Sequence, residues 1–181
     1  VPNIIDLTRF SPRQAGVVGA APHLVVTRNL EPIYDIATAL RAFAIVRQAF
    51  PAARLTVAGT GPERTALGQL ASTLGLEDAV TFSGRIDNAE IPALYTSADC
   101  MLNPSTVDNM PISILEALAS GVPVVSTDAG GIPDLVSHEH TALLVPIGDH
   151  EAMAAAALRV LRDEALAQRL IAAGLDEVAR Y

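Results

Sequence analysis

The chain contains no lysine. All 12 of its basic residues are arginines, against 20 acidic residues, so its formal net charge is −8. Nucleic acids are held mainly by clustered lysines and arginines, and an acidic domain without a basic stripe is therefore a poor candidate for binding them. Any anionic ligand would have to be held by a few local arginines and by backbone amides.

Cysteine and long apolar runs are also scarce. The single cysteine, Cys100, argues against a disulfide scaffold and is typical of a reducing compartment. It stands in an apolar segment, so we interpret it as an inert core residue. No apolar run approaches the roughly 20 residues of a membrane helix, and no signal peptide opens the chain. The sequence therefore predicts a cytoplasmic protein without a transmembrane segment.

Short apolar segments alternate along the chain with amphipathic ones. We expect strands at 23–28, 54–59, 80–83, 100–103, 122–127 and 142–145. Helices are expected at 34–50, 62–76, 88–97, from Pro111 onward, after the 130–131 turn, and at 149–161 and 163–179. Asn88 should cap the third of these helices. The alternation predicts an α/β fold with a doubly wound, parallel, six-stranded, Rossmann-like sheet and right-handed crossovers.

The length and the apolar content suit one compact domain. With 50% hydrophobic residues, residues 23–181 should form that domain, and residues 1–22 should form an interdomain linker. Pro2 and Pro12 disfavour helix in the linker, and Phe10 offers a hydrophobic anchor. Because the chain lacks an initiator Met and begins inside this linker, we expect it to be a fragment of a longer protein.

Doubly wound sheets bind ligands beyond the carboxyl ends of their strands, and polar loops collect there. Arg28 could hold a diphosphate, or pair at the surface with Glu31. Arg85 is open to the same two interpretations. The Gly59-x-Gly61 turn is either a tight turn or a phosphate loop. No Gly-x-Gly-x-x-Gly follows the first strand, which disfavours a dinucleotide dehydrogenase.

The most informative stretch is 103–136. Asp108 and Glu116 lie eight positions apart, so one stands at the mouth of a helix and the other about two turns inside it. Asp108 could simply cap this helix. The helix is apolar around most of its circumference, with Ile112 in one stripe, so Glu116 either meets water through a narrow opening or meets a ligand. The amides near 111–113 could hold a phosphate.

The residues alone support a nucleotide- or phosphate-binding α/β domain. His138 and His140 flank Glu139 on a loop, but no third metal ligand is placed by spacing, and we interpret them as solvated. No metal site is expected.

The run NPSTVDNMPISILEALASGVPVVSTDAGGIPDLV resembles the signature of the family 4 (group 1) retaining glycosyltransferases, in which seven residues separate two glutamates. Four other segments follow in the family's order over almost the whole chain: VPNIIDLTRFSP, LTVAGTGPE, VTFSGRI and LYTSADCMLNPS. The resemblance implies the C-terminal, donor-binding half of a GT-B enzyme. Such an enzyme transfers a glycosyl group from a nucleoside-diphosphate sugar with retention, in settings such as polysaccharide biosynthesis, and without an essential metal or other cofactor.

The implied partners are the nucleotide-sugar donor and the protein's own N-terminal acceptor domain, through which a peripheral membrane contact could arise. The resemblance implies three catalytic residues. Asp108, at the first glutamate position, contacts the transferred sugar. Glu116, at the second, binds the ribose hydroxyls, and Arg28 grips the diphosphate. The implied donor-binding residues are Gly61, Arg85, Ile86, Ser105, Asn109, Met110, Pro111 and Ile112.

The sequence departs from the family pattern at three positions. Asp108 is one methylene shorter than glutamate, Ile33 stands where a lysine is usual, and Ile4 stands where the linker has glycine. The catalytic interpretation therefore has two alternatives. One is a non-catalytic, glycosyltransferase-like module that binds a nucleotide sugar or a partner. The other is a relative of the GT-B phosphorylases or epimerases.

Overall fold

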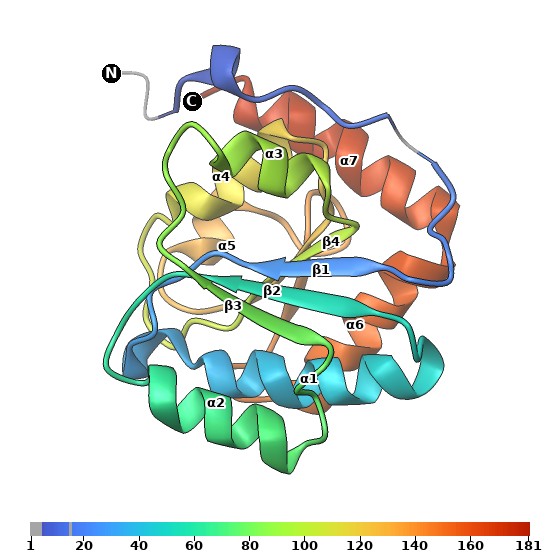
Figure 1. Ribbon diagram of the computed structural model, residues 1–181. Helices are drawn as coiled ribbons and strands as arrows, with labels where there is room; N and C mark the ends of the chain where they lie inside the picture. Colours follow the sequence, from blue (N-terminus) through green and yellow to red (C-terminus); the bar gives the residue numbers. More distant parts are fainter. Residues whose placement is uncertain (1–4, 15) are drawn as a thin grey trace.

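The computed structural model describes residues 5–14 and 16–181 and contains one parallel sheet with helices on both faces (Figure 1). Six strands form this sheet in the described residues, in the order β3-β2-β1-β4-β5-β6. They are β1 (His23–Val26), β2 (Arg54–Ala58), β3 (Val80–Gly84), β4 (Cys100–Asn103), β5 (Val124–Thr127) and β6 (Leu143–Val145). The predicted α/β doubly wound fold is confirmed. The strand order reverses between β1 and β4, which places the expected ligand crevice there.

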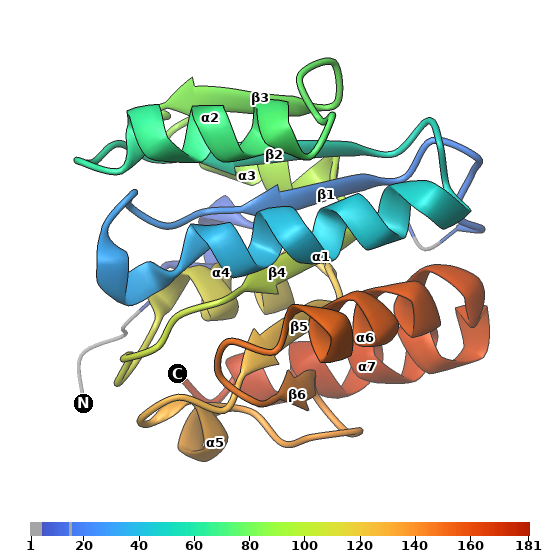
Figure 2. The ribbon, with the colours of Figure 1, turned by 90° about the horizontal axis from the view of Figure 1, so that it is seen from below.

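The helices divide between the two faces of the sheet. They are α1 (Ile36–Ala49), α2 (Arg64–Thr73), α3 (Ile91–Thr96), α4 (Ile112–Ala119), α5 (Ile132–Leu135), α6 (His150–Arg162) and α7 (Glu164–Val178). Helices α1, α2 and α6 lie on the face that Figure 2 shows from below, and α3, α4 and α5 lie on the other. Helix α7 packs against both α6 and α4.

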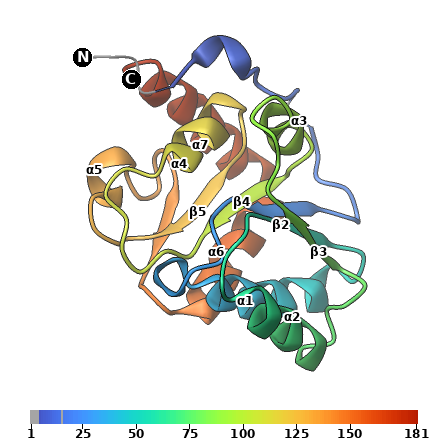
Figure 3. The same ribbon diagram turned by 60° about the vertical axis from the view of Figure 1, so that its left-hand side comes forward.

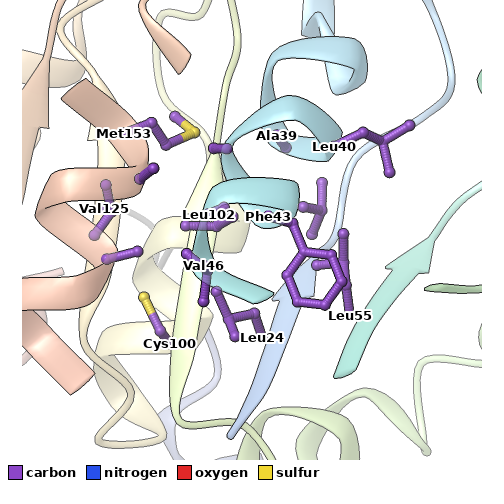
Figure 4. Packing of buried hydrophobic residues seen from close by; sticks show 14 of the residues in the cluster. Leu24, Ala39, Leu40, Phe43, Val46, Leu55, Cys100, Leu102, Val125 and Met153 are labelled. Atoms are coloured by element: carbon purple, nitrogen blue, oxygen red, sulfur yellow. The ribbon is translucent and has the colours of Figure 1, made fainter. Parts of the chain in front are cut away.

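Alternation along the strands fills both layers of the core. On β1, Leu24 and Val26 point into the cluster under α1, whereas Val25 points into the cluster under α4, because successive strand side chains face opposite ways. Figure 4 shows the first cluster, where Phe43 lies among residues of β1, β2 and β4. Cys100 belongs to it and is buried, and burial raises the pKa of its thiol. It is therefore a core residue, as predicted.

Helices α1, α2 and α3 begin two or three residues later than the sequence predicts, and α2 begins at Arg64 rather than at residue 62. Helix α3 begins at Ile91, its N-cap is Glu90, and no side chain caps it, so the prediction of an Asn88 cap is wrong. Helix α1 begins at Ile36 rather than at Tyr34, because Asp35 adopts the left-handed conformation (φ 44°) and separates α1 from a 3-10 turn at Pro32–Tyr34. Aspartate tolerates this conformation, and the Thr38 hydroxyl donates to Asp35 Oδ2 over 2.6 Å.

The N-terminal segment packs beside α3, α4 and α7 before it reaches β1 (Figure 1). Phe10 is buried, as expected of an anchor, and Arg13 pairs with Asp99 at 2.9 Å. The assignment of residues 1–22 as an interdomain linker stays a prediction. Pro2 and Ile4 lie outside the described residues. Among the helices within 5–14 and 16–181, none combines the length and apolar character needed to cross a bilayer.

Candidate functional site

A cleft of about 400 Å³ opens beyond the carboxyl ends of β1, β2 and β3. Figure 3 brings forward the loops at this end of the sheet. The cleft is lined by residues that follow these strands, together with one carboxylate from α4: Thr27, Asn29, Ala58, Gly59, Thr60, Arg85, Ile86, Asn88, Ile91 and Glu116. Three residues singled out from the sequence, Arg85, Ile86 and Glu116, therefore meet at one cavity.

The loops that follow the strands at the carboxyl end of the sheet form a rim around the cleft. Glycines allow these loops to approach one another closely. A Cβ on Gly59 would lie 2.2 Å from the Arg28 carbonyl oxygen, and one on Gly61 would lie 2.3 Å from that of Leu30. The Leu30 amide donates to Thr60 O over 2.9 Å in the same place. Gly61 does not line the cleft. Its lack of a side chain instead lets the loop after β2 pack on the loop after β1.

The loops after β4 and β5 meet in the same way. A Cβ on Gly130 would lie 2.2 Å from the Asp108 carbonyl oxygen, and the Gly131 amide donates to that oxygen over 2.9 Å. The Thr106 amide donates to Ile33 O over 2.7 Å, which ties the β4 loop to the loop after β1. The loop that carries Asp108 is therefore held by the loop after β5 on one side and by the loop after β1 on the other. This is the switch point, where the strand order reverses between β1 and β4.

Arg28 and Asp108 form an ion pair across this switch point. Their side chains are only 15% and 9% exposed, and the Arg28 guanidinium also stacks on the Tyr34 ring, 4.6 Å from its centroid. Burial lowers the pKa of Arg28, although an arginine still stays charged. Of the two interpretations of Arg28 that the sequence left open, the surface pair with Glu31 is wrong, because the guanidinium turns inward to Asp108. The capping prediction for Asp108 is also wrong, because Pro111 is the N-cap of α4.

The N-terminus of α4 opens on the same rim. No side chain caps it, and the first amides of an α-helix find no acceptor within it. The Ser113 hydroxyl is buried there and finds no hydrogen-bond partner among residues 5–14 and 16–181. Ile112, expected to pack in an apolar stripe, is 48% exposed, because it begins the helix at the rim where no other element covers it. This helix end has the polarity that suits an anion.

Glu116 projects from the second turn of α4 into the cleft. Partial burial raises the pKa of its carboxyl, while the hydrogen bond from Tyr95 and the charge of Arg9 act in the opposite direction. The Tyr95 hydroxyl lies 3.4 Å from Glu116 Oε2. Glu116 is thus a half-buried carboxylate with a single side-chain hydrogen bond in the described residues, and much of its capacity to accept hydrogen bonds remains for a ligand.

Of the remaining predicted residues, Ser105 and Pro111 are buried, and Asn109 and Met110 are exposed. Ser105 is fully buried and donates to Asn103 Oδ1 over 3.1 Å, so its hydroxyl supports the loop and does not face the rim. None of these four residues lines the cleft. His138 is engaged within its loop, since its Nδ1 accepts the Leu144 amide over 2.9 Å.

Sequence reasoning missed several polar contributors to the site, among them Asn29 and Thr60 of the cleft lining. Thr27 and Asn88 line the cleft, and Tyr95 stands behind Glu116. The position of Thr27 directly after a buried strand was an available signal for it. Tyr95 lies within the LYTSAD segment and looks apolar by pattern, so only the three-dimensional contacts single it out.

Fold and topology together define a doubly wound, Rossmann-like α/β domain, a class that binds its ligands where the strand order reverses, here between β1 and β4. A family model described as "Glycosyl transferases group 1" matches residues 9–176. The chain therefore belongs to the group 1 glycosyltransferases, as the resemblance implied.

Similar proteins agree with this assignment. The chain is 32% identical over 161 residues to N-acetyl-alpha-D-glucosaminyl L-malate synthase of Bacillus anthracis. The matched region covers 89% of this chain and 41% of that relative. It is 33% identical over 184 residues to a GDP-mannose-dependent alpha-(1-6)-phosphatidylinositol monomannoside mannosyltransferase of Mycobacterium tuberculosis, covering 92% of this chain and 48% of the relative. Its fold matches Anabaena HepE, solved with UDP and glucose, at a TM-score of 0.86 and 23% identity, covering 97% of this chain and 50% of that one. The chain thus spans less than half the length of these two curated relatives.

Proposed function

We propose that this chain is the C-terminal, donor-binding half of a retaining GT-B glycosyltransferase. In this proposal the cleft takes a nucleoside-diphosphate sugar, and a second domain supplies the acceptor. The observation that carries the proposal is that Glu116 and the Arg85 loop line one cleft, and that the largely buried Arg28 stands between two residues of its lining, Thr27 and Asn29. The names of two similar proteins, a GDP-mannose-dependent mannosyltransferase and a protein solved with UDP and glucose, support this class of donor.

Each part of the donor has a suitable counterpart at the rim. Glu116 accepts hydrogen bonds from the ribose hydroxyls, and the loop at Arg85 and Ile86 lies against the base. The Arg28 fork and the open amides of α4 bind the diphosphate. With no lysine in the chain, these two groups carry the cationic role, as the composition led us to expect.

The reaction breaks the bond between the anomeric carbon and the β-phosphate oxygen, and its electron pair leaves with the diphosphate. A new bond forms from an acceptor oxygen to the same face of that carbon, and the acceptor proton is released. Arg28 and the helix amides stabilise the negative charge on the leaving diphosphate. In this proposal Asp108, beside Arg28, stabilises the positive charge that develops on the sugar. No metal ion is needed in this scheme.

Calorimetry on the 181-residue chain with UDP, GDP and ADP tests the proposal. At least one of the three should bind, and Glu116→Ala should weaken that binding about tenfold, as expected for hydrogen bonds to a charged group. Glu90→Ala is the matched control, because Glu90 is an exposed glutamate near α3 that does not line the cleft. A folded chain that binds none of the three nucleotides would overturn the proposal.

A non-catalytic module that binds the same donor is the second candidate. One observation favours it: Asp108 is committed to Arg28, and its side chain is shorter than the family's glutamate. Release of free nucleoside diphosphate from UDP-, GDP- or ADP-sugars by the full-length protein, given its acceptor domain, separates the two. Turnover supports the enzyme, and tight donor binding without turnover supports the module.

A further inference from the structure

We propose that Tyr95 is the positioning residue that holds the Glu116 carboxylate in the orientation a ribose requires. This inference rests on the proposed function and extends it, because the cleft as described leaves open what fixes the direction of the one carboxylate that lines it. Tyr95 does not itself line the cleft. It would act on the nucleotide only through Glu116.

The hydroxyl of Tyr95 sits at the meeting point of three elements. The side chain comes from α3 and is 0% exposed. Its oxygen lies 2.7 Å from Thr27 Oγ1 at the end of β1, 3.1 Å from the Ser113 carbonyl oxygen in α4, and 3.4 Å from Glu116 Oε2. It therefore bridges the switch point directly behind the cleft.

Counting protons assigns a direction to these contacts. A tyrosine hydroxyl has one proton to donate, and both the Ser113 carbonyl and the Glu116 carboxylate can only accept. Either hydroxyl can donate in the contact between Thr27 and Tyr95, and Thr27 as the donor is the arrangement that leaves the tyrosine proton for α4. A carboxylate attracts that proton more strongly than a peptide carbonyl does. The chain Thr27–Tyr95–Glu116 thus orders the carboxylate from the buried side.

The ring of Tyr95 is fixed as firmly as its hydroxyl. Phe10 of the N-terminal segment packs edge-on against it, with centroids 6.4 Å apart and an interplanar angle of 62°. Burial raises the pKa of the Tyr95 hydroxyl, and the negative charge of Glu116 adds to this effect. The hydroxyl therefore remains a proton donor throughout the pH range in which the protein is handled. Glu116 faces a neutral donor from α3 and the positive charge of Arg9 from the N-terminal segment.

Removal of the hydroxyl by Tyr95→Phe tests the inference. Binding is measured by calorimetry with whichever of UDP, GDP or ADP the unaltered chain binds, and with its 2′,3′-dideoxy counterpart. Affinity for the ribonucleotide should fall about three- to tenfold, the effect of one lost hydrogen bond, while affinity for the dideoxy nucleotide should stay unchanged. Tyr181→Phe, which removes a tyrosine hydroxyl at the end of the chain, is the matched control and should change neither.

A double-mutant cycle distinguishes a positioning role of Tyr95 from a merely structural one. In a Glu116→Gln background, Tyr95→Phe should weaken ribonucleotide binding no further, because the residue acts through that carboxylate. Thr27→Val provides a second route to the same chain of hydrogen bonds if Tyr95→Phe does not fold. It should weaken the ribonucleotide more than the dideoxy nucleotide.

Three outcomes would overturn the inference: equal losses for both nucleotides, additive losses in the double mutant, or no loss at all when Glu116→Gln alone weakens binding. Absence of binding by the unaltered chain is a different result. It would overturn the proposed function, and the inference would fall with it.

Discussion

The two ends of the sheet treat their polar side chains differently. At the amino end, buried His23 uses both ring nitrogens, with Nδ1 3.2 Å from Ser97 O and Nε2 2.7 Å from Thr56 Oγ1. Asp99 accepts the His23 amide over 2.8 Å and pairs with Arg13. At the carboxyl end, Arg28 Nε and Ser113 Oγ are buried and have no hydrogen-bond partner within the described part of the chain, and Glu116 has one long contact there.

This difference is the one expected between an end that only stabilises the fold and an end that binds a ligand. A buried polar group without a partner destabilises the folded state by about 1–3 kcal/mol, so a chain selected only for stability would partner such groups, as the amino end does. Unused hydrogen-bonding capacity gathered at one rim is what a ligand requires. Two further such atoms occur in the described residues: Asp108 Oδ2, which faces Arg28 at the same rim, and Arg47 Nε in the last turn of α1, away from it. The signal is therefore the clustering and not any single atom.

Breaking the ion pair at the carboxyl end should have the largest effect. Arg28→Ala leaves Asp108 buried without its partner, and should lower the free energy of unfolding by about 2–3 kcal/mol while reducing nucleotide-diphosphate binding more than tenfold. Arg28→Lys should not restore binding, because lysine lacks the planar fork. Urea denaturation and calorimetry measure the two effects.

Arg64→Ala is the control for this variant. Arg64 also stacks on an aromatic ring, with its guanidinium 4.1 Å from the centroid of Phe82, but it starts α2 and does not line the cleft. It should leave nucleotide binding unchanged. Equal losses for the two variants would show that the stacking, and not the position at the switch point, was being measured.

Gly130→Ala should have the next largest effect. Gly130 has φ 53°, and a Cβ there would meet the Asp108 carbonyl at 2.2 Å, so the backbone holding Asp108 must shift, at a cost of about 2 kcal/mol or more. Gly148 also has a positive φ, 75°, but nothing lies within 4 Å of its Cβ position. Gly148→Ala should therefore cost only about 1 kcal/mol. Thermal unfolding of both variants separates the cost of the close contact at position 130 from the cost of a positive φ alone.

Two buried serines sharpen the contrast within the rim itself. Ser105 donates to Asn103 Oδ1, whereas Ser113 Oγ has no partner in the described residues. Ser105→Ala should therefore cost about 1 kcal/mol, and Ser113→Ala should cost nothing or stabilise slightly. A substantial loss of stability for Ser113→Ala would mean that its hydroxyl is engaged in the folded protein, and would weaken the contrast between the two ends.

The sequence allowed most of the fold to be predicted, but less of the site. Short apolar strands and amphipathic helices predicted all six strands of the described sheet, because burial on both faces leaves a clear pattern. The site depends on pairings between distant loops, which a one-dimensional pattern does not contain. For Arg28 the sequence offered only a diphosphate or a surface pair with Glu31, three residues away, because local pairs are the ones that a sequence displays. Its actual partner, Asp108, is brought to it by the switch in strand order.

The smallest predicted effects concern pH, and they have opposite signs at the two ends. Burial lowers the pKa of His23, whose ring also faces Arg54, Asp99 and the Ser97 carbonyl. The unfolded chain therefore binds this proton more tightly, and stability should fall as the pH drops below about 6.5, the ordinary value for histidine. Burial raises the pKa of Glu116. The folded chain binds that proton more tightly, so stability should fall as the pH rises above about 4.5, near the ordinary value for glutamate.

Melting temperatures from pH 4 to 8 test both signs in single variants. Glu116→Gln should melt higher than the unaltered chain at pH 7, and the difference should shrink toward pH 4, because the unaltered carboxyl is then protonated in both states. His23→Gln should melt lower at pH 7, where it loses well-made hydrogen bonds, and the gap should narrow as acid removes the advantage of the neutral imidazole. If Glu116→Gln were destabilising at pH 7, the carboxylate would be a satisfied structural group like Asp99, and the carboxyl end would lose its claim to be the functional one.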